Sequence, residues 1–160
     1  MGIDAATYRQ IVGCFATGVT VVTTAAGGRL HGITANALTS VSLDPLLLLV
    51  CVDKAAHAHA EVERAGRFAV NVLSAEQEEL SRLFATTGEP EEGRLRGAGF
   101  HLSASGLPVL EGSLAYLECE VADRCDGGDH TVFIASVLEG AVLRDAPPLL
   151  YYRAAYRRLA

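Results

Sequence analysis

The apolar residues of this chain fall into short runs that are separated by glycine, proline and small polar residues. β-Branched residues dominate positions 19–24, and seven apolar residues follow one another from Leu46 to Val52. β-Branched and aromatic residues are enriched in strands, and an unbroken apolar run of this length is typical of a strand buried on both faces. The runs with these properties predict strands at 19–24, 30–36, 46–52, 68–73, 113–122 and 131–143, with a short extended segment at 149–153.

Glycine and proline mark the turns between these runs. Gly27-Gly28 is a two-residue signal for a tight hairpin, because glycine adopts the positive φ angles that such turns require. Residues 126–130 form a second predicted turn, and Pro147-Pro148 interrupts regular structure near the C-terminus. A turn rich in Ser and Thr is expected after Asn36, and it leads through Asp44-Pro45 into the apolar run.

Two segments in the first half of the chain have helical patterns. Residues 4–15 begin with Asp4, whose carboxylate can accept hydrogen bonds from the first N–H groups of a helix. Four apolar residues of this segment share one stripe at helical spacing, namely Tyr8, Ile11, Val12 and Phe15. Residues 55–64 favour a second helix, which Gly66 is expected to end.

A third helix is predicted after Ser74. Ser74 and Gln77 have the spacing of a capping box, in which each residue can satisfy a free N–H group of the other. An apolar stripe that includes Phe84 then carries the helix to the neighbourhood of residue 85. The following residues, 87–99, are polar and rich in glycine, which predicts a mobile surface loop.

The order of these elements indicates the fold class. Many strands with only two or three helices favour a mainly β protein, an antiparallel barrel with helices at its periphery. No internal repeat or interdomain linker interrupts the pattern, so we expect residues 1–160 to form a single domain. A chain of this size can bury about 70% of the surface that it exposes when unfolded.

The composition is that of a globular protein with an acidic balance. Half of the residues are apolar, 20% are charged, and the formal net charge is -6. This balance argues against partners such as nucleic acid or an anionic membrane. No apolar run approaches the roughly 20 residues of a membrane-spanning helix. The first ten residues lack a basic segment followed by an apolar stretch, so we expect a cytoplasmic protein without a secretory signal.

The cysteines and histidines do not suggest a metal site. The four cysteines, Cys14, Cys51, Cys119 and Cys125, show no Cys-x-x-Cys spacing, and three lie in apolar periodic segments. We therefore expect reduced and mostly buried thiols. His57 and His59 point in different directions on a helix, which favours two surface histidines over a pair of metal ligands.

Two polar clusters remain as candidates for ligand binding, and neither forms a familiar catalytic motif. The first contains Thr34, Asn36, Thr39, Ser40 and Ser42. Such residues also form turns by bonding their own backbone. Five of them in nine positions beside an apolar run exceed what a turn requires, which favours a site for a flat, polar ligand. The second cluster, Asp129-His130, fits either a solvated hairpin tip or a contact to a ligand's carboxamide or phosphate.

Five motifs along the chain occur together, and in the same order, in one protein family. The motifs are Phe15-Ala-Thr-Gly-Val-Thr-Val-Val-Thr-Thr24, the segment 32–54, Gly66-Arg-Phe-Ala-Val-Asn-Val-Leu73, Gly128-Asp-His-Thr-Val-Phe-Ile134 and Pro148-Leu-Leu-Tyr-Tyr152. Through them the chain resembles the short-chain flavin reductases, which are the reductase components of two-component flavin-dependent monooxygenases. The resemblance covers nearly the whole chain. It implies the FMN-binding split β-barrel fold and a homodimer with flavin near the subunit interface.

The resemblance also implies an activity. Such an enzyme is an NAD(P)H:flavin oxidoreductase, which passes a hydride from NADH or NADPH to N5 of FMN or FAD and supplies the reduced flavin to a separate monooxygenase. Because the cofactor performs the chemistry, no catalytic side chain and no metal are expected. Two alternatives remain open. One is a flavin-binding split-barrel enzyme that acts on a small metabolite, and the other is a non-catalytic barrel that binds a ligand or a protein partner.

The resemblance finally assigns residues to the site. Those implied for flavin are Thr34, Ala35, Asn36, Ala37, Leu38, Thr39, Ser40, Val41, Ser42, Cys51, Val52, Asp53, Lys54, Ala58 and Phe84. Those implied for the nicotinamide nucleotide are Gly128, Asp129 and His130. Residues 55–58 offer no Ser or Thr to a flavin phosphate. The phosphate would then rely on Lys54, on backbone N–H groups at the helix start, or on one of the nearby histidines.

Overall fold

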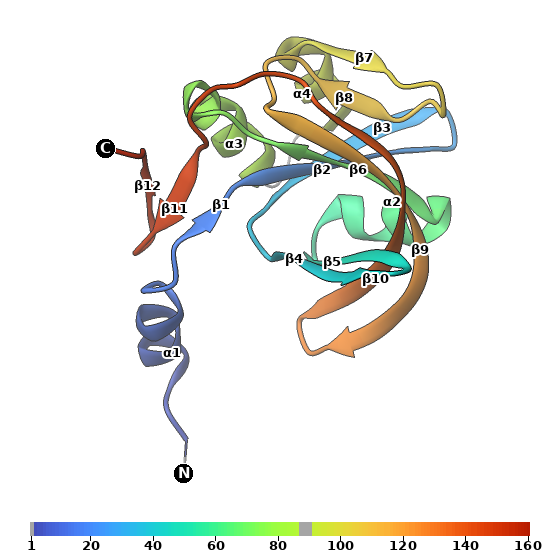
Figure 1. The fold of residues 1–160 in the computed structure, drawn as a ribbon. Coiled ribbons are helices and arrows are strands. Elements are labelled where there is room, and N and C mark those ends of the chain that lie inside the picture. The colour runs from blue at the N-terminus through green and yellow to red at the C-terminus, as the bar shows by residue number, and fades with distance from the viewer. Residues whose placement is uncertain (1, 87–90) are drawn as a thin grey trace.

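A seven-stranded sheet forms the body of the protein and curls into an open barrel (Figure 1). The computed structural model describes residues 2–86 and 91–160. The strands are β2 (Thr20–Ala26), β3 (Arg29–Ala35), β4 (Leu38–Leu43), β5 (Leu46–Asp53), β6 (Arg67–Val72), β9 (Ala115–Gly127) and β10 (His130–Val142). Their order is β3-β2-β6-β9-β10-β5-β4, and every neighbouring pair is antiparallel. The predicted mainly β, antiparallel architecture is confirmed.

Two small sheets and four α-helices complete the described part of the chain. The small sheets are β1 (Thr17–Gly18), β11 (Leu150–Tyr152) and β12 (Ala155–Arg157), and β7 (Phe100–Leu102) with β8 (Pro108–Leu110). The helices are α1 (Ala5–Val12), α2 (His57–Ala65), α3 (Glu78–Ala85) and α4 (Glu91–Ala98), with a 3₁₀ turn at Ala75–Gln77 before α3. Helix α1 and the β11–β12 pair project from the barrel (Figure 1). None of the described helices has the length and apolar composition that crossing a bilayer requires.

The helix ends follow the local chemistry that the sequence predicts. Asp4 Oδ1 accepts a hydrogen bond from the N–H of Thr7 at 2.7 Å, which caps α1. Gly66 ends α2 in the left-handed conformation, with φ 65°, a backbone geometry that glycine adopts without steric cost. Gln77 Oε1 accepts from the N–H of Ser74 at 2.9 Å, as a capping box requires.

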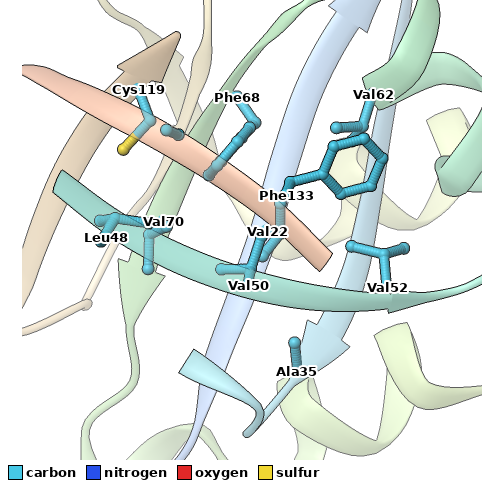
Figure 2. Packing of buried hydrophobic residues seen from close by; sticks show 11 residues of the cluster. Val22, Ala35, Leu48, Val50, Val52, Val62, Phe68, Val70, Cys119 and Phe133 are labelled. Atoms are coloured by element: carbon cyan, nitrogen blue, oxygen red, sulfur yellow. The ribbon is translucent and has the colours of Figure 1, made fainter. Parts of the chain in front are cut away.

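The main core lies inside the barrel, where side chains from several strands and from α2 meet (Figure 2). Phe68 on β6 and Phe133 on β10 are fully buried and pack with Val22 of β2 and Val62 of α2. Burying a side chain of this size stabilises a fold by about 1.5 to 3 kcal/mol relative to leaving it exposed. Packing of Val62 therefore fixes α2 against the barrel, beside the end of β5 that the helix follows in sequence.

Strand β5 is buried on only one face, so the prediction that both faces are buried is wrong. Its inward residues Leu48, Val50 and Val52 have exposed fractions of 4%, 0% and 1%. The residues between them are only partly buried, and Leu46 is 52% exposed. An antiparallel barrel wall has a single inner face, so the outer apolar side chains of β5 stay accessible in one copy of this chain.

The Ser/Thr-rich segment after Asn36 is a strand rather than the predicted turn. Residues 38–43 form β4, which pairs with β5 in a register that joins Leu38 to Val50 and Leu43 to Leu46. The turn itself contains only Asp44-Pro45. Pairing with a long apolar strand satisfies the backbone of this segment, and this tertiary contact outweighs the local turn preference of serine.

The loop predicted for residues 87–99 is also partly wrong. Residues 87–90 lie outside the described part of the chain, but α4 occupies Glu91–Ala98. Leu95 is fully buried in the second apolar cluster, and Arg94 Nη1 donates to the carbonyl oxygen of Thr86 at 2.5 Å. Two buried anchors therefore hold a helix whose polar, glycine-rich sequence has little helical preference of its own.

The four cysteines are free, but most of them are not buried as predicted. Only Cys119, which points into the barrel, is buried, and this burial raises the pKa of its thiol to about 12. Cys51 lies on the outer face of β5 and is half-buried, whereas Cys14 and Cys125 are exposed. The prediction failed because an apolar neighbourhood in sequence does not indicate which face of a barrel strand a side chain occupies.

Candidate functional site

Three segments that are far apart in the sequence meet at one end of the sheet. They are the connection between β3 and β4, the end of β5 and the tip of the β9–β10 hairpin. The N–H of Cys51 donates to the carbonyl oxygen of Ala37 at 3.0 Å, which joins the first two segments. Asp53 pairs with His130 across the β5–β10 ladder, which joins the second and third. The fold thus places the predicted flavin segments beside the predicted nucleotide segment.

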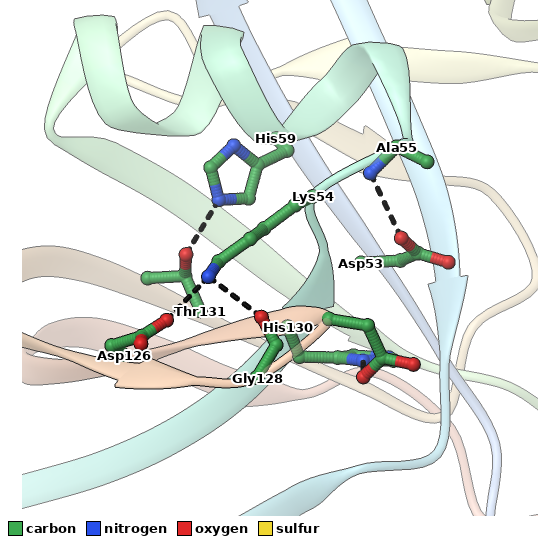
Figure 3. Close-up of polar contacts among 9 residues, drawn as sticks. Asp53, Lys54, Ala55, His59, Asp126, Gly128, His130 and Thr131 are labelled. Carbon is green, nitrogen blue, oxygen red and sulfur yellow. Dashed lines mark hydrogen bonds and ion pairs between the residues drawn. The ribbon is translucent and has the colours of Figure 1, made fainter.

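The hairpin tip is tighter than the predicted five-residue turn. Strand β9 runs to Gly127 and β10 begins at His130, so only Gly128 and Asp129 form the turn. Gly128 adopts a φ of 78°, which a side chain would disfavour. Lys54 Nζ donates to the carbonyl oxygen of Gly128 at 2.7 Å and forms an ion pair with Asp126 (Figure 3).

His130 stands at the base of this tip with its imidazole partly accessible. The side chain is 40% exposed, and its Nδ1 lies 2.7 Å from Asp129 Oδ1. The hydrogen bond from His130, followed by its charge, lowers the pKa of the Asp129 carboxyl below its usual value. Because His130 is also the strand partner of Asp53, the imidazole is fixed relative to the end of β5 rather than free in solution.

Helix α2 begins directly behind this junction. Asp53 Oδ1 accepts from the N–H of Ala55 at 2.8 Å, and Ala56 precedes the helix without a side-chain cap. His57 is exposed, as predicted. The prediction of a surface residue is wrong for His59, which is half-buried, with Nε2 2.7 Å from Thr131 Oγ1 and its ring 5.7 Å from that of Phe133.

The fifteen residues predicted for flavin differ in accessibility. The exposed ones are Asn36, Ala37, Thr39, Ser40, Val41, Asp53 and Lys54, and the partly exposed ones are Thr34, Leu38, Ser42 and Cys51. The buried ones are Ala35, Val52, Ala58 and Phe84. Ser42 pairs with Leu47, six positions before Asp53, so about 20 Å of strand separates it from the hairpin tip at 3.3 Å per residue. Ala37 and Leu38 contact Cys51 and Val50, two and three positions before Asp53, so they lie nearer the tip than Ser42 does.

Phe84 and Thr34 belong to a second layer behind β3. Phe84 is 2% exposed, and its ring fills the space beside Gly32, where an added Cβ would lie 2.9 Å from Cε1. Thr34 Oγ1 donates to the carbonyl oxygen of Ser81 at 2.6 Å. The Phe84 ring therefore points from α3 onto β3, and the Thr34 hydroxyl points from β3 to α3. With only 2% of the residue exposed, Phe84 is not accessible to a ligand in one copy of this chain.

A polar network that no sequence motif indicated continues from this layer to the C-terminal strands. Ser81 Oγ lies 2.7 Å from the hydroxyl oxygen of Tyr156, and the Arg82 guanidinium lies 4.7 Å from the centre of the Tyr156 ring. Arg82 and Tyr156 border a surface cavity of about 600 Å³, which is also lined by Glu78, Thr86 and Tyr151. The partners are separated by about half of the chain, so no local spacing could have indicated this network.

Comparisons with known proteins give the same family along the whole length. A model of the family described as "Flavin reductase like domain" matches residues 12–160. The reductase subunit HsaB of a flavin-dependent monooxygenase from Mycobacterium tuberculosis is 38% identical over 159 residues, which cover 96% of this chain and 82% of that protein. A "Flavin reductase (NADH)" from Kitasatospora aureofaciens is 40% identical over 160 residues, covering 98% of this chain and 82% of that protein.

A solved structure extends the comparison to three dimensions. The NADH:FAD oxidoreductase SgcE6 of Streptomyces globisporus, in complex with NAD and FAD fragments, superposes with a TM-score of 0.91 at 37% identity. The match covers 98% of this chain and 93% of that one. The predicted split-barrel fold is therefore confirmed, and the family match over residues 12–160 shows that the chain belongs to the flavin reductase-like domain family.

Proposed function

We propose that this chain is an NAD(P)H-dependent flavin reductase that supplies reduced flavin to a separate monooxygenase. The observation that carries the proposal is the meeting of the β3–β4 connection, the end of β5 and the β9–β10 tip at one end of the sheet. The first two segments resemble the family's flavin contacts, and the third resembles its nicotinamide contact. Two flat rings that exchange a hydride must lie against each other, and this adjacency provides for that arrangement.

The residues along β4 fit a flat and polar cofactor. Asn36, Thr39 and Ser40 are exposed, and Ala37 adds no bulk beside them. Strand β4 is the terminal strand of the sheet, so one of its edges also offers unpaired backbone groups. Amide, hydroxyl and backbone groups can donate and accept hydrogen bonds at the edge of a flavin ring. When bound, FMN or FAD supplies the hydride acceptor, while these groups hold and orient it.

The hairpin tip is proposed to hold the reduced nicotinamide nucleotide. Gly128 leaves the tip without a side chain, and the half-exposed imidazole of His130 can donate a hydrogen bond to a carboxamide or phosphate. Its Nδ1 is engaged by Asp129, which orients the ring so that Nε2 is available. Nε2 accepts a hydrogen bond from a carboxamide N–H when the imidazole is neutral, and donates to a carbonyl or phosphate oxygen when the imidazole is protonated. The residues of this chain therefore position the donor, and no side chain is required to act as an acid or a base.

We further propose that two copies of the chain form a homodimer through α1 and the apolar side chains on the outer face of β5. Helix α1 has eight residues and none of them is buried, so the apolar Tyr8 and Ile11 are 58% and 57% exposed. Phe15, three residues after the helix, is 76% exposed. A helix this short is unstable in water without tertiary contacts. A mean hydropathy of +0.27 also fits a chain that covers apolar surface on association. Light scattering that gave a stable monomer of 16.8 kDa at micromolar concentration would contradict the dimer.

The uncapped start of α2 favours one alternative, a flavin-binding barrel enzyme that acts on a small metabolite. With Ala56 before the helix and no side-chain cap, the site lacks a hydroxyl that could bind a flavin phosphate. A barrel that uses flavin in another reaction, on a small metabolite, would tolerate this difference. The choice between FMN and FAD, the choice between NADH and NADPH, the single-domain organisation and the cytoplasmic location stay predictions.

The absorbance spectrum of the purified protein tests the proposal directly. Flavin that binds should show a shifted visible band and quenched fluorescence, and NADH should bleach that band under anaerobic conditions. NADH oxidation that requires added FMN or FAD would support a reductase. Flavin binding without any NADH oxidation would instead support the alternative reaction, and no flavin binding would remove both.

A further inference from the structure

Lys54 makes three hydrogen bonds to the tip of the β9–β10 hairpin (Figure 3). Its Nζ donates to Gly128 O at 2.7 Å and forms an ion pair with the carboxylate of Asp126. Its backbone N–H donates to the carbonyl oxygen of Asp129 at 2.9 Å. We infer that Lys54 is a positioning residue that fixes the tip carrying His130, and that it does not serve as the ligand of a flavin phosphate.

The tip needs such a contact because it extends beyond the strand ladders. The β5–β10 ladder ends at the pair Asp53 and His130, and the β9–β10 ladder ends at Gly127 and His130. Gly128 and Asp129 therefore have no strand neighbour on the side of β5. Two of the bonds from Lys54 replace the missing rungs and connect both tip carbonyl groups to the residue that follows β5, and the third holds Asp126 at the end of β9.

The same bonds make Lys54 a poor phosphate ligand. Its ammonium charge is already paired with Asp126, so a phosphate would have to displace or compete with a carboxylate. The Lys54 side chain is 42% exposed and that of Asp126 is 80% exposed, and an ion pair this accessible contributes little to overall stability. Its effect is thus on the geometry of the tip rather than on the free energy of unfolding.

The consequence for the reaction rests on the proposed function, in which His130 contacts the nicotinamide nucleotide. The imidazole is held by Asp129, whose carbonyl group accepts from the backbone N–H of Lys54. Lys54 Nζ holds the residues before it, Gly128 and Asp126, and only these two contacts are lost when the side chain is removed. Without the Lys54 side chain the tip can shift, and small misplacements of reacting groups cost up to about 100-fold in rate. We expect Lys54→Met to raise the KM for NADH by about tenfold, within that range, while flavin affinity stays within about twofold.

Four variants and one control separate positioning from phosphate binding. Lys54→Met and Asp126→Asn should both raise the KM for NADH, and the double variant should be no worse than Lys54→Met, since the two residues act together. Lys54→Arg should restore the parent KM, because a guanidinium can bond a carboxylate and a carbonyl group. Glu120→Gln removes another exposed charge from β9, away from the tip, and should behave like the parent.

Two further measurements decide the outcome. Fluorescence titration should show that Lys54→Met binds riboflavin with the same affinity as the parent, and that it also binds FMN with the same affinity as the parent. A loss for FMN alone, with a normal Asp126→Asn variant, would make Lys54 the phosphate ligand and overturn the inference. Hydrogen exchange of residues 126–131 should accelerate in Lys54→Met and Asp126→Asn but not in Glu120→Gln, and unchanged exchange would also overturn it. Since exchange needs no turnover, a parent that oxidises no NADH would refute the proposed function alone.

Discussion

Strand β10 passes through two regions of this protein that are held in different ways. Phe133 points into the barrel, is fully buried, and packs with side chains from several strands and from α2. His130, three residues earlier, is partly exposed, and its position depends on a few polar contacts from Asp129 and Lys54. In the core, many apolar contacts each contribute a small part of the stability, whereas at the tip water can replace each polar contact.

Because of this difference, single substitutions in the core should act mainly on stability, and those at the tip mainly on function. Loss of one core side chain leaves a cavity that the packed neighbours cannot fill, so the whole fold is destabilised. Loss of one polar contact at the tip changes local geometry but leaves the core intact, because regions with few buried contacts open independently. The two regions should therefore respond to mutation in opposite ways.

The largest effect is expected for Leu48→Ala on β5. Leu48 is 4% exposed and belongs to the barrel core, so its truncation should lower the free energy of unfolding by about 2 to 5 kcal/mol. Urea unfolding measures this change. Leu102→Ala on β7 is the matched control. Leu102 is 54% exposed, so this substitution should lower the free energy of unfolding by about 0.5 kcal/mol or less. Equal losses in the two variants would contradict the assignment of the core.

The next effect concerns His130→Ala, which should slow NADH-dependent flavin reduction by up to about 100-fold. The side chain is 40% exposed and outside the core, so the melting temperature and flavin affinity should stay nearly unchanged. Stopped-flow reduction at fixed flavin and varied NADH measures the rate. Parent rates in the variant would return His130 to the role of a solvated turn residue, and a large drop in melting temperature would remove the contrast with Phe133.

The core was largely predictable from sequence because its signal is local. The β-branched and apolar runs identified strands close to β2, β5, β6 and β10, and Asp4 and Gly66 marked helix ends correctly. The errors arose where tertiary contacts decide the outcome. Pairing with β5 turned the Ser/Thr segment into β4, and buried Leu95 with Arg94 held α4 in a segment without helical preference.

The candidate site was predictable only in part, because its motifs are local but their arrangement in space depends on tertiary contacts. Motifs located residues 34–42, 51–54 and 128–130, but only the strand register shows that Leu38 lies nearer the hairpin tip than Ser42 does. The bonds from Lys54 to Gly128 and from Thr34 to Ser81 join residues 74 and 47 positions apart. No spacing rule covers such separations, because they depend on strand register and on which strands become neighbours.

A smaller effect is expected on flavin affinity at Ser40. Ser40→Ala should weaken binding by the value of one hydrogen bond, about 0.5 to 1.5 kcal/mol, and Ser40→Trp should weaken it further by steric exclusion. Fluorescence titration with FMN and with FAD measures both. Ser40 is exposed on the edge strand β4, so neither variant should unfold the protein. If both variants bind flavin like the parent, the flavin does not lie against the middle of β4.

The smallest expected effect is a change in the titration of one carboxylate at the tip. The hydrogen bond from Lys54, followed by its charge, lowers the pKa of Asp126 below its ordinary value of 3.8. A lowered pKa in the folded state means that this interaction is fully present above about pH 3.8 and is lost as the pH falls through the folded-state value.

Carboxyl carbon NMR can follow Asp126 and Asp129 together, since His130 lowers the pKa of Asp129 in the same way. In Lys54→Met the pKa of Asp126 should return toward 3.8, whereas that of Asp129 should stay low. The control is Glu120→Gln, in which both carboxyl groups should titrate as in the parent. An unchanged Asp126 in Lys54→Met would mean that Lys54 does not hold the tip in solution. The contrast between a core held by many contacts and a tip held by few would then have to rest on His130 and Asp129 alone.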